Sequence, residues 1–402
     1  DYGATWTKIV NGIPAGSYVH AVREDPTRAG LLYAGTEHGI YISFDDGDDW
    51  RPLSLNLPDV QVSDIAVERN DLVIATHGRS MYVLDDIGPL RQFNSQVASA
   101  QVHLFAPHDA IRGVSDATIQ YALAQPADSV TIQILDASGR VIRTMTGGQR
   151  DSAASDSGSP PGTPKGCETS RRGRQSRPDG KRGLNRFTWD LRYAGAVTFP
   201  CLIMWGASPG RGPLAVPGTY RVRVTANGMT QTAPLTVRLN PALEGVTRAD
   251  LQEQFALAIK IRDRVSDADR AVLRIRDVRS QVQDRLGRTH NRRITTAGQS
   301  LVERLTAAED SLYQTRNRSG EDPLNFPIKI NNRMAALGNS VERGDNRPTG
   351  AAYVVFKQLS ATLDAQLQAL NGLFDSGVGR FNRLLTAEHL EPVRAAPLTL
   401  TP

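Results

Sequence analysis

The sequence has 402 residues, of which 40% are hydrophobic and 22% charged, and its formal net charge is +5; this composition is ordinary for a globular protein and excludes disorder throughout. It contains no run of about 18 apolar residues, so we expect no membrane span. The basic segment around Arg171 has no Phe, Tyr or Trp, which argues against nucleic-acid binding, and the length predicts about two to four domains.

A ten-residue segment, 41–50, carries the clearest motif near the start of the chain. It reads Ser-x-Asp-x-Gly-x-x-Trp from Ser43 to Trp50, directly after an alternating run. Asp45 can accept hydrogen bonds from amides of the turn, and Gly47 can supply a positive φ. The acids of this segment lack the distal glutamate of a calcium-binding loop. We therefore interpret the motif as structural, with no metal ligand, no cofactor-binding residue and no catalytic residue.

A shortened copy of the same motif opens the chain with Asp1, Gly3 and Trp6. Trp6 and Trp50 are 44 residues apart, which is typical of one blade of a β-propeller. We expect these residues to be structural as well. A chain that begins inside a repeat is expected to continue a longer protein upstream.

Residues 1–92 contain two successive sets of short β-rich runs and are predicted to be the C-terminal blades of an incomplete propeller. The runs, separated by Gly, Pro and Asp turns, lie at 18–22, 31–36, 39–43, 65–67, 72–76 and 80–84. The second set lacks the tryptophan and the full turn, which is common in a terminal repeat.

Two stretches carry a family resemblance. The segment from Ser43 to Trp50 resembles the Asp box of bacterial neuraminidase (BNR) repeats, shared by sialidases and sortilin-type propellers. The run from Ala75 to Leu90 resembles the closing blade of secreted bacterial proteins labelled sortilin-like or glycosyl hydrolase. The resemblance implies an exported propeller protein (periplasmic, outer-surface or extracellular) that binds a protein or peptide.

A connector is predicted over 93–115, including the run Pro107-His108-Asp109, and an immunoglobulin-like β-sandwich over 116–240. Alternating runs flank a turn at 136–139, and Asn227-Gly228 is a strong two-residue hairpin turn. Six or so short strands in this length fit such a sandwich.

The sandwich segment also carries a resemblance and an interruption. Segments 139–143, 185–190 and 217–222 resemble the immunoglobulin-like module of flagellar hook-capping proteins, in which they are scaffold. Residues 147–183 are rich in Gly, Ser, Pro and Arg, which predicts a flexible surface insertion.

Two cysteines, Cys167 and Cys201, lie in this middle region. They could form one disulfide in an oxidising compartment or stay apart, because sequence does not place their Cα atoms within bonding range. No His or further Cys stands at zinc-ligand spacing.

Residues 241–390 change to a helical pattern and are predicted to form a helical bundle. Apolar residues recur at intervals of three and four over 251–286, which predicts a helix of about 38 residues. Thr247 and Asp250 resemble a capping box at its start, and Gly287 is a fitting stop.

Further helices are predicted over 295–317, through 330–337 and through 353–374, with a break at Gly377 and Gly379 before a last short turn, and an extended tail at 391–402. The predicted fold class is therefore multidomain, with all-β modules (propeller blades and an immunoglobulin-like sandwich) followed by an all-α bundle.

Residue types of a sialidase site occur at strand and loop positions of the first region: Arg23, Glu24, Glu37, Tyr41, Arg79 and Tyr82. Glycosidase chemistry needs two carboxyl groups within about 5–10 Å of each other in space, which spacing alone does not demonstrate. His38 and His77 fall at corresponding places of the two repeats and could face a channel, although a structural histidine at a blade turn is the simpler interpretation.

The predicted function is that of a non-catalytic, exported binding protein that recognises a protein or peptide, or a glycan, through its propeller. Two alternatives stay open. One is a sialidase-like glycoside hydrolase whose active site lies in upstream blades. The other is a structural subunit of a cell-envelope assembly that makes contact through its long helices. The oligomeric state is left open.

Overall fold

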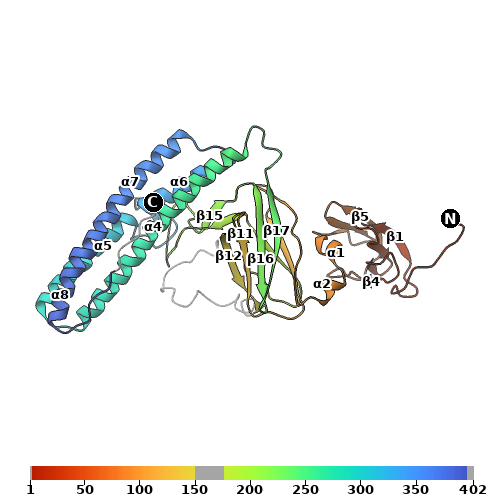
Figure 1. Cartoon of the computed structure of the whole chain (residues 1–402), viewed down its shortest axis with the longest axis horizontal. Coiled ribbons are helices and arrows are strands. Elements are labelled where there is room, and N and C mark those ends of the chain that lie inside the picture. The colour runs from red at the N-terminus through yellow and green to blue at the C-terminus, as the bar shows by residue number, and fades with distance from the viewer. Residues whose placement is uncertain (1, 150–175, 396–402) are drawn as a thin grey trace.

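The computed structural model describes residues 2–149 and 176–395. Figure 1 shows three regions in a row, with small sheets near the N-terminus, a larger pair of sheets in the middle and a helical region at the far end. No helix in the described part of the chain is long and apolar enough to cross a bilayer. The described chain is thus β-rich and then helical, as the sequence predicts.

Two antiparallel sheets form the N-terminal region. The first has the order β1-β2-β3-β4 and the second β5-β6-β7; their bounds are β1 Val19–Glu24, β2 Leu32–Thr36, β3 Gly39–Ser43, β4 Arg51–Pro52, β5 Val62–Glu68, β6 Asp71–Thr76 and β7 Met81–Leu84. A shared core that includes Tyr33, Ile42, Ile65 and Ile74 joins them. A Cβ on Gly35 would lie 2.8 Å from Val62 Cγ1, so the close approach of the two sheets requires glycine there.

A short helix, α1 (Gly88–Gln92), ends the segment predicted as propeller blades, and the segment predicted as a connector holds a second short helix, α2 (Ser95–Ser99), and two short strands, β8 (Val102–Leu104) and β9 (Ala110–Ile111). Both strands belong to the sandwich, because β8 pairs with β10 and β9 pairs in parallel with β17. A strand of two or three residues is too short to show a recognisable alternation of apolar and polar residues. Such a strand is defined by its pairing with distant strands.

The sandwich consists of a three-stranded sheet, β13-β10-β8, and a five-stranded sheet, β12-β11-β16-β17-β9. The bounds are β10 Ala117–Leu123, β11 Val130–Leu135, β12 Val141–Gly147, β13 Gly183–Trp189, β16 Gly218–Ala226 and β17 Met229–Arg238. Alternate residues of both sheets, among them Tyr121, Ile132 and Trp189, form one core. Asn227 and Gly228 have φ of 50° and 74°, as a two-residue primed hairpin turn requires.

A two-stranded ribbon links the sandwich to the helices. It pairs β14 (Arg192–Ala194) with β15 (Arg211–Leu214). The segment between these strands lies against the bundle, where the Asn332 side chain accepts from Trp205 N at 2.8 Å and donates to Trp205 O at 2.9 Å. Phe199, in the same segment, is part of the core of the helical region.

The helical region contains α4 (Arg248–Gly287), α5 (Arg292–Leu312), the short η2 (Asp322–Leu324), α6 (Ile330–Val341), α7 (Gly350–Gly372), η3 (Leu373–Val378) and α8 (Gly379–Ala387). The capping box at Thr247 and Asp250 is present. The predicted break at Gly377 and Gly379 is wrong, because a π-helical turn, η3, carries the helix on into α8. A Cβ on Gly377 would lie 2.7 Å from Leu373 Cδ1, so this glycine serves close packing within a continuing helix.

Candidate functional site

The Asp-box turn is held by its own side chains. Ser43 Oγ donates to Asp45 Oδ1 at 2.7 Å and accepts from Gly47 N at 2.9 Å, while Asp45 Oδ1 also accepts from Asp49 N at 3.0 Å. The Ser43 hydroxyl and the Asp49 amide lower the pKa of Asp45. Gly47 has φ of 93°, a conformation that favours glycine. The polar groups of the motif are therefore engaged in stabilising the turn.

The two tryptophans of the repeated motif have different surroundings. Trp50 is 4% exposed, and its indole N–H donates to Ile9 O at 2.9 Å. Trp6 is 90% exposed, although its indole N–H donates to Gly3 O at 3.1 Å. Asp1 lies outside the described residues. In the shortened copy, the Trp6 indole thus makes a local hydrogen bond, but its ring stays exposed.

Three of the residues with sialidase-like side chains, Arg23, Glu37 and Tyr41, have partners within the N-terminal sheets. Arg23 Nη2 donates to Asp64 Oδ1 at 2.7 Å, and the Glu37 carboxylate lies 2.7 Å from His20 Nε2. Tyr41 is buried in a small cluster with the Trp50 ring. The others stay where the sequence places them: Glu24 in β1, Arg79 in the β6–β7 turn and Tyr82 in β7.

The two repeat histidines lie in similar turns: His38 is the second residue after β2, and His77 is the first residue after β6. His38 Nδ1 lies 3.1 Å from Asp59 Oδ1 in an exposed pair, and the His77 amide donates to Gln61 O at 2.9 Å. Both residues thus have roles in connecting turns of their sheets.

Cys167 and residues 150–175 of the predicted insertion lie outside the described residues, as do residues 396–402 of the predicted tail. The disulfide between Cys167 and Cys201 therefore stays a prediction.

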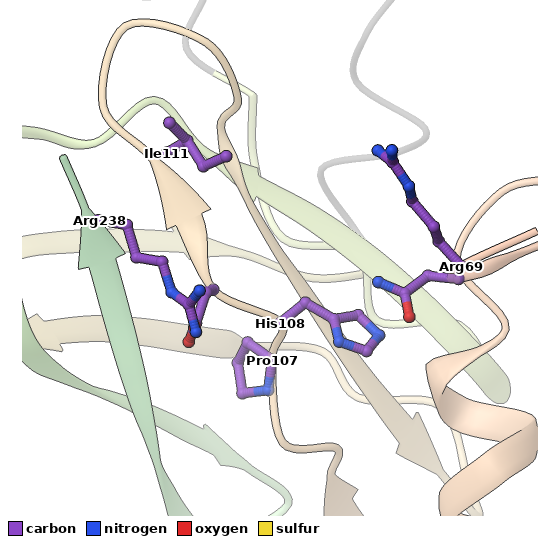
Figure 2. Close-up of a pocket in the computed structure, with 7 residues that line it drawn as sticks. Arg69, Pro107, His108, Ile111 and Arg238 are labelled. Carbon is purple, nitrogen blue, oxygen red and sulfur yellow. The ribbon is translucent and has the colours of Figure 1, made fainter. Parts of the chain in front are cut away.

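An open pocket lies where the β5–β6 hairpin meets the edge of the sandwich. Its volume is about 580 Å³, and its lining residues are Arg69, Asn70, Pro107, His108, Asp109, Ile111 and Arg238. Figure 2 shows Arg238 and Ile111 on one side, Arg69 on the other and His108 between them. Three stretches far apart in the sequence therefore meet at one pocket.

The Arg91 side chain fixes the hairpin that forms one wall of the pocket. Arg69 and Asn70 form the two-residue turn between β5 and β6, with φ of 54° at Arg69. The Arg91 guanidinium donates to Arg69 O at 2.8 Å and to Asn70 Oδ1 at 3.0 Å. It also donates to the fully buried Asp25 carboxylate at 2.8 Å. Burial would raise the pKa of Asp25, but hydrogen bonds from Arg91 and Thr27 outweigh it and lower that pKa.

His108, which lines the pocket, pairs with the Asp86 carboxylate behind it. His108 Nε2 lies 3.0 Å from Asp86 Oδ1, and the two side chains are 40% and 16% exposed. The Asp86 carboxylate raises the pKa of His108, although partial burial opposes this. Burial would raise the pKa of Asp86, but His108 and the Gly88 amide outweigh it and lower that pKa. The pair is therefore charged over a wider pH range than isolated side chains would be.

Side-chain hydrogen bonds also join the N-terminal region, which carries the hairpin, to the sandwich. Gln120, on β10, donates from Nε2 to Asp86 Oδ2 at 2.7 Å. Gln92 Nε2 donates to Ala106 O at 3.1 Å, and Gln92 Oε1 accepts from Ala106 N at 2.8 Å. The walls of the pocket thus come from parts of the chain that are bonded to each other.

The sandwich wall contributes an ion pair from neighbouring parallel strands. Arg238, the last residue of β17, pairs through Nη2 with Asp109, just before β9, and the two side chains are 67% and 35% exposed. Arg238 O accepts from Arg112 N at 3.0 Å, which continues the strand pairing. The arrangement presents two guanidinium groups and an imidazole in one open pocket, which suits recognition of a polar or anionic group.

Sequence reasoning recognised neither wall of this pocket. The Pro107-His108-Asp109 run falls in the predicted connector, and Arg69 and Asn70 fall in the four-residue gap between the predicted strands 65–67 and 72–76. A short gap between two β-rich runs is a hairpin signal, and this signal points to a turn near Arg69.

The fold and the pocket define a β-rich multidomain protein with an immunoglobulin-like sandwich. A family model described as FlgD Ig-like domain matches residues 108–156, a region that includes His108 and Asp109 of the pocket. The sandwich is thus similar to that family over this segment.

Solved structures with detected similarity are remote. The extracellular domain of a hybrid two-component system from B. thetaiotaomicron is 7% identical, with a TM-score of 0.15; the match covers 56% of this chain and 26% of that one. Dimeric latent PorU from Porphyromonas gingivalis is 12% identical, with a TM-score of 0.19; the match covers 56% of this chain and 20% of that one. A search of the curated proteins finds no match.

Proposed function

We propose that this chain is part of a non-catalytic, exported binding protein that recognises a protein or peptide partner at the pocket between its N-terminal sheets and its sandwich. The observation that carries the proposal is the open pocket of about 580 Å³, whose Arg69, His108 and Arg238 come from three segments. A pocket of this size, with a few convergent polar groups, is typical of recognition sites.

The N-terminal sheets are, in this proposal, blades of an Asp-box propeller. The Asp-box turn and the face-to-face packing of the two sheets support it. The outer face of β5–β7 supports it as well, because Val73 pairs with Val83 and Ala75 pairs with Met81 on that face. Met81 is 70% and Val83 55% exposed. A sheet that is apolar on both faces is suited to lie between two neighbouring sheets.

The walls of the pocket are held in place, which supports a role of the pocket in ligand binding. The Arg91–Asp25 pair fixes the hairpin wall, and the Asp86 carboxylate with the Gln92 amide joins that wall to the sandwich. Preorganised walls reduce the entropy that is lost on binding.

Export is proposed from the resemblance to secreted bacterial proteins.

The proposal is tested by selecting peptides from a random display library on the purified 402-residue protein. We expect selected peptides to bind the wild type and the Arg186→Ala control, an exposed arginine on β13, and to bind the Arg69→Ala/Arg238→Ala double variant at least about tenfold more weakly. Equal binding to the double variant would place the site elsewhere. Release of aryl alcohol from an aryl sialoside by a longer protein that includes the upstream blades would favour the glycoside-hydrolase alternative instead.

The structural-subunit alternative is favoured by one observation in the helical region. Tyr353, Val354 and Val355, at the start of α7, are 42%, 57% and 39% exposed. Consecutive exposed apolar residues of this kind occur at protein–protein contacts. Light scattering during size exclusion tests it: a multimer that Val354→Asp converts to monomer supports the alternative, and a monomeric wild type counts against it.

A further inference from the structure

We infer that the pocket between the β5–β6 hairpin and the sandwich captures a carboxylate group of the partner, held between the guanidinium groups of Arg69 and Arg238. This inference rests on the proposed function, since it names the chemical group that a bound peptide would insert. The source of the carboxylate is an acidic side chain of that peptide.

Arg69 provides a donor group at a fixed backbone position. Its side chain is 90% exposed, and its nearest acid, Glu68, is 75% exposed with 3.6 Å between Arg69 Nε and Glu68 Oε1. An exposed pair of this length contributes little, so an incoming carboxylate can displace it at small cost. The backbone of the turn is meanwhile held by Arg91. The guanidinium is therefore available, while its point of attachment is not free to move away.

Arg238 provides the opposite donor group. Asp109 contacts it through Nη2, and the Arg238 side chain remains 67% exposed. A guanidinium carries five N–H donors in a planar fork, so contact with one carboxylate oriented through one nitrogen leaves further donors for a second. Asp109 thus orients Arg238 toward the pocket without using the whole group.

His108, which lies between the two arginines, adds a positive charge when its imidazole is protonated. The charged groups that face it are Asp86, which lies 3.0 Å away, together with Asp109 and Arg91. Asp86 favours the protonated imidazole, and Arg91 disfavours it. A carboxylate in the pocket would favour protonation further, so carboxylate affinity should fall as pH rises through the pKa of His108.

The acids beside the pocket limit its net positive charge. Asp109, Asp86 and Glu68 lie beside Arg238, His108 and Arg69 respectively. The carboxylate is therefore recognised mainly through the planar guanidinium fork, which it can contact with both of its oxygens.

The test uses small probes and the full chain, with the arginine Nε–Hε signals followed by NMR. We expect butyrate, which has a single carboxylate, to shift the signals of both Arg69 and Arg238, and butyramide to shift neither. The Arg69→Ala and Arg238→Ala variants should each weaken butyrate binding at least about fivefold. Arg186→Ala should bind as the wild type does, and Arg69→Lys should recover only part of the affinity because lysine lacks the planar fork.

Equal shifts by butyrate and butyramide, or a shift of only one of the two arginine signals by butyrate, would overturn the inference. The outcome is separable from that of the peptide selection. If selected peptides bind at the pocket whether or not they contain acids, the carboxylate inference fails and the proposed function stands. If butyrate binds at both arginines and no peptide is selected, the carboxylate inference stands and the proposed function fails.

Discussion

Arg112 and Asp345 are 233 residues apart in sequence and form an ion pair, with 3.0 Å between Arg112 Nε and Asp345 Oδ1. Arg112 is 2% exposed and also donates to Leu214 O, Ala215 O and Gln254 Oε1. One guanidinium therefore joins the sandwich, the β14–β15 ribbon and the helical region. The contact lies four residues beyond His108 of the pocket, so it also bears on the position of the site.

Arg112→Met should lower the free energy of unfolding by about 3 kcal/mol, because removing one partner leaves a buried carboxylate and several carbonyl groups without a donor. Chemical denaturation followed by far-UV circular dichroism measures this loss. Arg182→Ala, an exposed arginine, is the control and should leave the midpoint unchanged. A midpoint for Arg112→Met equal to the wild type would contradict the assigned role.

Gly12→Ala should disrupt the cover of the Asp-box tryptophan. A Cβ at Gly12 would lie 2.0 Å from Trp50 O, while Gly16, at a similar φ, has no atom within 4 Å of its Cβ position. Both variants meet the strain of a positive φ, of about 1 kcal/mol, but only Gly12→Ala adds a backbone clash. We expect a red shift of tryptophan fluorescence and a lower melting temperature for Gly12→Ala relative to Gly16→Ala. Identical behaviour of the two variants would show that the clash is relieved without cost.

The His108–Asp86 pair should make stability depend on pH in a defined window. The folded-state pKa of His108 is raised, so its contribution is complete below its unfolded pKa and is lost as pH rises through the raised value. The folded-state pKa of Asp86 is lowered, so its contribution is present above its unfolded pKa and is lost as pH falls through the lowered value. The wild type should therefore exceed His108→Asn in stability most between about pH 4 and 6.5. Urea midpoints measured from pH 4 to 9 check this, and a difference that grows toward pH 9 would contradict it.

The effect of Asp269 on the pH dependence of stability should be opposite to that of Asp86. It is fully buried in α4, and although Asn331 donates to it at 3.0 Å, burial raises its pKa to about 7. A raised acid pKa means that the folded state holds the proton that the unfolded state releases, so stability falls as pH rises from about 4 to 7. Asp269→Asn should remove this fall and be more stable than the wild type at pH 8, by roughly 1–3 kcal/mol, with little difference near pH 4. The exposed Asp375→Asn is the control. Parallel pH profiles of wild type and Asp269→Asn would refute the prediction.

The disulfide predicted between Cys167 and Cys201 is open to a direct measurement. Intact protein treated with iodoacetamide should gain no adduct without reductant and two adducts after reduction and unfolding. Two adducts on unreduced, unfolded protein would show that both thiols are free.

The amino-acid sequence by itself determined the elements whose signals are local. The intervals of apolar residues with the Thr247–Asp250 capping box predict α4, and Asn227-Gly228 predicts the β16–β17 hairpin. The Asp-box spacing from Ser43 to Trp50 likewise predicts a turn stabilised by its own side chains. These predictions succeed because helix caps, turns and alternation depend on residues a few positions apart.

Only the tertiary structure decided the features that join distant residues. The strands β8 and β9 exist through pairing with β10 and β17. The helix continues through Gly377, where an added Cβ would lie 3.3 Å from Leu301 Cδ1 of another helix. The pocket of Arg69, His108 and Arg238 forms because a hairpin turn and two strand ends meet in space, and no local pattern of three residues spread over 170 positions encodes such a meeting.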